Sequence, residues 1–185
     1  MKRAILATLL SVAALTSSAA VMNFDDAGVP ANSWTRITTY QGFEFLGDTL
    51  FIDTVGSSWN YGAVSGEVTM YSTYGTRTTI KKVGGADFTF DGLWAKTWGN
   101  AAARTGHILG YNDGALVFDS TIDMTSTFKQ FAGKAGMIDE LQLEMGYYLV
   151  DNLALNAQRV PEPASLALLG LGLAGISVLR RRKQA

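Results

Sequence analysis

Hydrophobic and polar residues alternate with a period of two along most of residues 21–159. Phe43 and Phe45 share one face of such a pattern, and Val68 and Met70 share another. This alternation is typical of half-buried β-strands rather than of helices. The segments in which it predicts strands are residues 22–24, 43–45, 50–55, 68–71, 88–90, 107–111, 115–120, 138–143 and 147–155.

Turn signals separate these strands at intervals of about eight to twelve residues. The strongest is Asn112-Asp113-Gly114, which predicts a β-hairpin because Asn, Asp and Gly tolerate positive φ. Asp91-Gly92 predicts a turn after Phe90. No amphipathic helix stands out between the two ends of the chain. The pattern predicts an all-β domain, an antiparallel jelly-roll-like β-sandwich. A different Greek-key topology stays open.

The first twenty residues have the three parts of a secretory signal. Lys2 and Arg3 precede an apolar segment, residues 4–16, and small residues follow at 17–20. This order is typical of a signal peptide that signal peptidase removes. We therefore assign residues 1–20 as a signal peptide; a membrane anchor or an ordinary buried helix is the alternative.

The last 26 residues, 160–185, form a second sorting signal. Pro161-Glu162-Pro163 interrupts any helix, an uncharged stretch at 164–179 follows, and residues 180–183 are Arg180, Arg181, Arg182 and Lys183. As a helix the apolar stretch would be about 24 Å long, somewhat shorter than a ~30 Å hydrocarbon core. The basic cluster should stay cytoplasmic, which places residues 21–159 on the other side of the membrane.

This tail resembles the PEP-CTERM sorting domain. The resemblance implies recognition by an exosortase, an integral-membrane cysteine transpeptidase of Gram-negative bacteria that make extracellular polysaccharide. It also implies that the tail anchors the protein transiently in the inner membrane, is cut near Pro-Glu-Pro, and leaves the body in the cell envelope or biofilm matrix. A plain single-span anchor is the alternative.

Charge and cysteine content narrow the function of the body. The chain has no cysteine, which excludes disulfides and thiol chemistry. Its net charge of −1 hides an acidic body, because residues 21–159 carry nine basic and fifteen acidic residues. Nucleic-acid binding needs clustered Lys and Arg, so no nucleic-acid partner is expected.

No catalytic constellation emerges from the residues. His107 is the one histidine and lies inside a predicted strand, so a Ser-His-Asp triad would rest on it alone. Paired carboxylates can hydrolyse glycosides, but sixteen acidic residues always offer pairs. We therefore predict that the protein is not an enzyme; a secreted hydrolase stays as an alternative.

Both ends of the body resemble the first and last strands of jelly-roll carbohydrate-binding modules, at residues 23–26 and 147–155. That resemblance implies a structural Ca²⁺ held by Asp25 or Asp26 and by Asp151. Calcium takes six to eight oxygen ligands, of which few are visible. The alternative is that these carboxylates hydrogen-bond turns. No other cofactor is expected.

Aromatic residues in Gly-rich stretches are the candidates for ligand contact, because exposed rings stack on sugar faces at low entropic cost. Trp98 lies in such a stretch, and Trp34 and Trp94 are expected in the core. Trp59 in a predicted loop, with Tyr61, is the candidate glycan contact. The sequence thus predicts an exported, non-enzymatic envelope or matrix protein; a glycan-binding module of the exopolysaccharide matrix is the first alternative.

Overall fold

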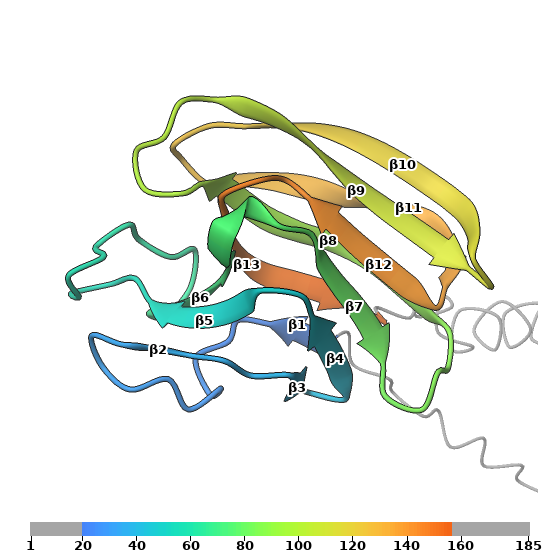
Figure 1. Ribbon diagram of the computed structural model, residues 1–185, viewed down its shortest axis with the longest axis horizontal. Helices are drawn as coiled ribbons and strands as arrows, with labels where there is room; N and C mark the ends of the chain where they lie inside the picture. The colour runs from blue at the N-terminus through green and yellow to red at the C-terminus, as the bar shows by residue number, and fades with distance from the viewer. Residues whose placement is uncertain (1–19, 157–185) are drawn as a thin grey trace, which may run out of the picture. The chain divides into compact units, whose positions relative to one another are not determined.

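The structure is a computed structural model that describes residues 20–156, and the predicted signal peptide, except for Ala20, and the sorting tail lie outside these residues. Thirteen strands and one short 3-10 turn fill the described part of the chain (Figure 1). The elements are β1 (Ala20–Met22), β2 (Trp34–Thr35), β3 (Thr39–Tyr40), β4 (Phe43–Leu46), β5 (Thr49–Asp53), β6 (Val68–Ser72), η1 (Thr73–Gly75), β7 (Thr78–Lys82), β8 (Phe88–Thr97), β9 (Arg104–Asn112), β10 (Ala115–Met124), β11 (Lys129–Ile138), β12 (Glu140–Glu144) and β13 (Tyr148–Leu155).

The strands form two antiparallel sheets. A seven-stranded sheet has the order β11-β8-β13-β6-β5-β2, with β1 paired to β13. A six-stranded sheet has the order β10-β9-β12-β7-β4-β3. The expectation of an all-β antiparallel sandwich is confirmed.

The last eight strands pair as a rolled-up hairpin. The β9–β10 hairpin lies innermost, and β8 pairs with β11, β7 with β12, and β6 with β13 around it. Successive pairs alternate between the two sheets. Strands distant in sequence are therefore neighbours, and the long return pairing brings Asp151 on β13 beside residues 64 and 65.

The two sheets enclose one apolar core. Successive side chains of a strand point to opposite faces, so every second residue of the central strands enters it. Phe51, Met70 and Val150 lie on the inner face of the seven-stranded sheet, and Ile80 and Leu143 on that of the other. All five are essentially inaccessible to solvent.

Two turn expectations have opposite outcomes. The hairpin at 112–114 is confirmed, with positive φ at Asp113 and Gly114. The turn expected at Asp91-Gly92 is wrong, because β8 runs straight through it. Gly92 has a φ of 134°, and a Cβ there would lie 2.8 Å from the carbonyl oxygen of Phe131, so this glycine allows close approach of β11 within a distorted strand.

Two further expectations concern tryptophan and membrane helices. Trp34 was expected in the core, but it lies on the edge strand β2 with half of its surface exposed; Trp94 is partly buried. Among residues 20–156 there is no helix long and apolar enough to cross a membrane. The helix predicted at 164–179 lies outside this range.

Candidate functional site

The outer face of the seven-stranded sheet is apolar at its centre. Leu50, Ile52, Tyr71 and Leu149 alternate with core residues, so they point away from the other sheet, yet all four are buried. The cover comes mainly from residues 54–67, the connection between β5 and β6, here called the strap. Trp59 and Tyr61 of the strap pack on this cluster, together with Trp98 and Phe128.

Asp151 anchors the strap to the sheet. Its Oδ2 accepts hydrogen bonds from the main-chain N–H groups of Val64 (2.7 Å) and Ser65 (2.9 Å). Its Oδ1 accepts one from the N–H of Asn152 (2.6 Å). The side chain is fully buried. Burial raises the pKa of this carboxyl above its ordinary value, although the three N–H donors act in the opposite direction.

Lys96 is a second anchor. Its Nζ donates a hydrogen bond to the carbonyl oxygen of Tyr61 at 2.8 Å and lies 5.6 Å from the centre of the Phe128 ring. Burial lowers the pKa of this ammonium group. The strap is thus held by one buried carboxylate and one buried ammonium, each bonded to main-chain atoms.

An aromatic pocket of about 380 Å³ opens beside the strap. Its lining is Tyr71, Ser72, Tyr74, Trp98 and Tyr147, which come from β6, η1 and the ends of β8 and β13. Four of these five residues are aromatic and none is charged. The volume lies in the range of ~300–1,000 Å³ that is usual for small-molecule sites. We call this cavity the aromatic pocket.

Trp98 is fixed in place by its neighbours. Its ring lies 4.9 Å from that of Tyr61 in an edge-to-face arrangement and 5.0 Å from that of Tyr71. The main-chain N–H of Trp98 donates to the carbonyl oxygen of Tyr147, and the main-chain carbonyl oxygen of Trp98 accepts from the N–H of Ala101 in a tight turn. The Tyr61 ring of the strap therefore supports Trp98, which is one of the lining residues of the aromatic pocket.

The two other rings of the pocket are exposed. Tyr74 is 78% exposed and has a φ of 58°, a left-handed conformation that is costly for a bulky residue. Tyr147 is 47% exposed, and its ring lies against Gly75 so closely that a Cβ there would be 3.2 Å away. A strained backbone that presents an aromatic ring to solvent is a feature of functional sites.

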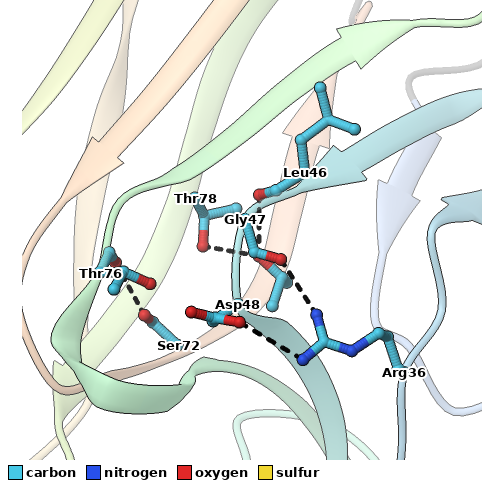
Figure 2. Close-up of polar contacts among 8 residues, drawn as sticks. Arg36, Leu46, Gly47, Asp48, Ser72, Thr76 and Thr78 are labelled. Atoms are coloured by element: carbon cyan, nitrogen blue, oxygen red, sulfur yellow. Dashed lines mark hydrogen bonds and ion pairs between the residues drawn. The ribbon is translucent and has the colours of Figure 1, made fainter.

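Polar groups hold the corner next to the pocket (Figure 2). Arg36 donates to the carbonyl oxygen of Gly47 (3.1 Å) and lies 3.5 Å from a carboxylate oxygen of Asp48. Ser72 donates to the carbonyl oxygen of Thr76 at 2.7 Å, which ties the two ends of η1 together. The Ser72–Thr76 bond closes the turn in which Tyr74 lies.

The carboxylates predicted to hold calcium are all used otherwise. Asp25 Oδ1 accepts the N–H groups of Glu67 and Val68, and Asp26 bonds the Tyr40 hydroxyl. Asp151 accepts three N–H groups, as described above. Across the part of the chain that the structure describes, no group of three or more His, Cys, Asp or Glu side chains could hold a metal ion. The structural Ca²⁺ at Asp25 or Asp26 and Asp151 stays a prediction.

The predicted glycan contacts lie beside the pocket rather than in it. Trp59 and Tyr61 are both partly buried on the strap, and the Tyr61 ring contacts that of Trp98, a residue of the pocket lining. The sequence analysis missed Tyr74 and Tyr147. The signal that could have found them is an aromatic residue next to glycine in a turn, as in Tyr74-Gly75 and Gly146-Tyr147.

A second, acidic cleft of about 510 Å³ lies where the two ends of the strap meet β5 and β6, and its lining includes Asp25, Asp53 and Glu67. Like Asp25, Asp53 accepts two main-chain N–H groups, which are those of Asn32 and Val55. His107 pairs with Asp119 at 2.8 Å on the exposed face of the six-stranded sheet, and neither residue lines this cleft or the aromatic pocket.

The comparisons with known proteins bear on the tail. The family model of the PEP-CTERM protein-sorting motif matches residues 159–183. The resemblance deduced from Pro161, Glu162, Pro163 and the arginine cluster at 180–182 is thereby confirmed: the chain carries this motif. A search of curated proteins gives no match.

Two solved structures are among those similar to the body. One is that of TmCBM61 in complex with beta-1,4-galactotriose, 8% identical, covering 64% of this chain and 90% of that chain with a TM-score of 0.37. The other is the enzymatically active domain of bacteriophage CBA120 tailspike protein 4, 14% identical, covering 74% of this chain and 20% of that chain with a TM-score of 0.33. Likenesses of this size establish neither ligand nor activity.

Proposed function

We propose that this chain, with its PEP-CTERM motif at residues 159–183, is an exported, non-enzymatic protein of the cell envelope or extracellular matrix. Signal peptidase removes residues 1–20, and an exosortase processes the tail near Pro161-Glu162-Pro163. The motif is the observation that supports sorting, and the signal-peptide pattern requires the same side of the membrane. The intact mass of the mature protein tests this half of the proposal.

We assign the body to the jelly-roll class of sandwiches. The nested pairing of the last eight strands around the β9–β10 hairpin supports this assignment. A jelly roll joins its strands at both ends of the sandwich, so loops gather there. η1 is such a connection, and it contributes Tyr74 to the aromatic pocket.

We further propose that the aromatic pocket binds a glycan of the matrix. The supporting observation is a cavity of about 380 Å³ whose lining residues have four aromatic rings and also the hydroxyl groups of Ser72 and of three tyrosines. Rings offer flat apolar area to the C–H face of a sugar, and hydroxyl groups at the rim satisfy its polar edge. The absence of charge among the lining residues favours a neutral sugar.

Retention on polysaccharide tests the pocket. We expect Tyr147→Ala to weaken binding of the processed protein to immobilised extracellular polysaccharide from its host by about tenfold, or about 1.4 kcal/mol. Trp34→Ala removes an equally exposed ring away from the pocket and should leave binding unchanged. Equal retention of both variants and the wild type would argue against the pocket, and release of new reducing ends during the assay would contradict the non-enzymatic proposal.

The arrangement of the acidic cleft supports the absence of catalysis. A glycosidase needs one carboxyl group held protonated as general acid and a second one free to act as base or nucleophile. Asp25 and Asp53 each accept two main-chain N–H groups, so both carboxylates take part in holding the loops of this cleft.

A further inference from the structure

The two sides of the sandwich differ in how their edge strands are protected. On one side the edges are β2 and β3, each two residues long, and short edge strands discourage pairing with other chains. On the other side the edges are β10 and β11, each ten residues long (Figure 1). Within residues 20–156 neither strand has a β-partner on its outer edge. Their outward N–H and C=O groups form two open ladders.

Charge is segregated between these two edges. β10 contains Asp119 and Asp123 and no basic residue, whereas β11 contains Lys129 and Lys134 and no acidic residue. All four side chains are exposed. Like charges directly across a strand pair are unfavourable and opposite charges are favourable. β10 should therefore avoid a second β10 and accept a β11.

One antiparallel register pairs opposite charges directly, because it places Asp119 opposite Lys134. It also places Asp123 opposite Gln130 and Lys129 opposite Met124, so neither of these two charges meets a like charge. Leu116 and Met137 then lie at the same end of the strand pair, beyond a register irregularity in each strand. These two residues are 54% and 50% exposed and are among the large apolar residues left uncovered at this side. Such a match of charge and apolar surface points to a strand of the same protein as the partner.

We propose that two copies of this chain associate through these edges, with β10 of each copy pairing antiparallel with β11 of the other. β10 and β11 are joined by residues 125–128 and terminate opposite sheets at the same side of the sandwich. A twofold axis along the strands exchanges the two sheets, so both pairs form at once. The interface is isologous and uses both open edges, which gives a closed dimer rather than a fibre.

Charge exchange tests this dimer. One variant carries Asp119→Lys and Asp123→Lys, and the other carries Lys129→Glu and Lys134→Glu. Each variant alone places like charges across both strand pairs, so its self-association should weaken by about tenfold or more. An equimolar mixture restores opposite charges at every pair and should form a heterodimer. The processed protein, purified from its host, is measured by sedimentation at low ionic strength.

Two results would overturn the proposal: a wild-type protein that stays monomeric at all concentrations, or variants that dimerise alone as the wild type does. Because Asp119 and Asp123 also bond His107 and Thr105, the acidic-strand variant could lose its fold. Amide hydrogen exchange of the wild type is therefore the second measurement. Protection in residues 118–124 and 129–134 should rise with protein concentration, and association without that rise would refute the edge pairing.

Discussion

Replacing Asp151 by alanine should lower the free energy of unfolding by about 2–3 kcal/mol, because a buried acceptor of two strap N–H groups is lost. Val64 and Ser65 lose the partner that joins residues 64 and 65 to the sheet. Burial raises the pKa of this carboxyl, so the ionised side chain already carries a desolvation cost that offsets part of its hydrogen bonds. The expected loss in the free energy of unfolding is therefore smaller than the loss that follows removal of one partner of a buried ion pair.

Two further variants identify the cause. Asp151→Asn keeps a carbonyl oxygen for Val64 and Ser65 and loses only the bond from Asn152, so the loss should be about 1 kcal/mol. Asp87→Ala removes an exposed carboxylate and should change stability by less than about 0.5 kcal/mol. Urea unfolding of all four proteins measures the differences. Equal midpoints for the Asp151→Ala and Asp87→Ala variants would show that the strap is not anchored in this way.

Replacing Tyr74 by glycine should separate stability from binding. The ring is 78% exposed and packs little, while its φ of 58° is one that glycine adopts without strain. Tyr74→Gly should therefore be about 1 kcal/mol more stable than Tyr74→Ala, which keeps the strained backbone and lacks the ring. Both variants should bind matrix polysaccharide about tenfold or more weakly than the wild type, since both lose a ring of the aromatic pocket.

Thermal unfolding and the polysaccharide retention assay measure the two effects on the same samples. Tyr74→Trp is the matched control, because it keeps a flat ring at the same strained position and should retain binding. If Tyr74→Gly bound polysaccharide as the wild type does, the exposed ring would have no part in recognition. If Gly and Ala were equally stable, the backbone strain at this position would be absent.

Period-two alternation found the strands that bury one face. β4, β6 and β13 were predicted from Phe43-Phe45, Val68-Met70 and residues 147–155, and all three are confirmed. β11 was missed because it is an edge strand, exposed along most of its length and rich in glycine and lysine, so no apolar alternation marks it. The alternation of apolar and polar residues indicates which strands bury one face, and most residues of an edge strand such as β11 are exposed.

The layer outside the seven-stranded sheet could not be deduced from local pattern. Period-two alternation in the strand predicted at residues 50–55 places Leu50 and Ile52 on one face and Phe51 on the other, which is correct, but both faces are buried. The reason is that the strap folds over the outer face, and its anchor, Asp151, lies 86 residues away along the chain from Ser65. Contacts at such separations depend on topology, which the alternation of residues does not specify.

The acidic residues show how one residue type supports two interpretations. Asp25 and Asp151, the candidates for a structural calcium, both accept main-chain N–H groups of residues 64–68. The alternative that these carboxylates hydrogen-bond turns describes their contacts. Gly66 makes this possible at Asp25, because a Cβ at that position would collide with the carboxylate.

The aromatic pocket was only partly foreseen. Trp98 and Tyr61 were among the candidate aromatics, but Tyr74 and Tyr147 were not, because each stands in a turn between two strands. The fold brings them together, since η1 follows β6, Tyr147 precedes β13, and β6 pairs with β13. Pairing of distant strands, rather than spacing along the chain, determines the composition of this site.

The intact mass of the mature protein recovered from its own host tests the sorting proposal most directly. We expect a mass that lacks residues 1–20 and everything beyond the Pro161-Glu162-Pro163 region, with the body found in the envelope or the extracellular matrix. A mature protein that retains residues 164–185 would show that the tail is a permanent anchor. That result would contradict exosortase processing as the purpose of the motif in this chain.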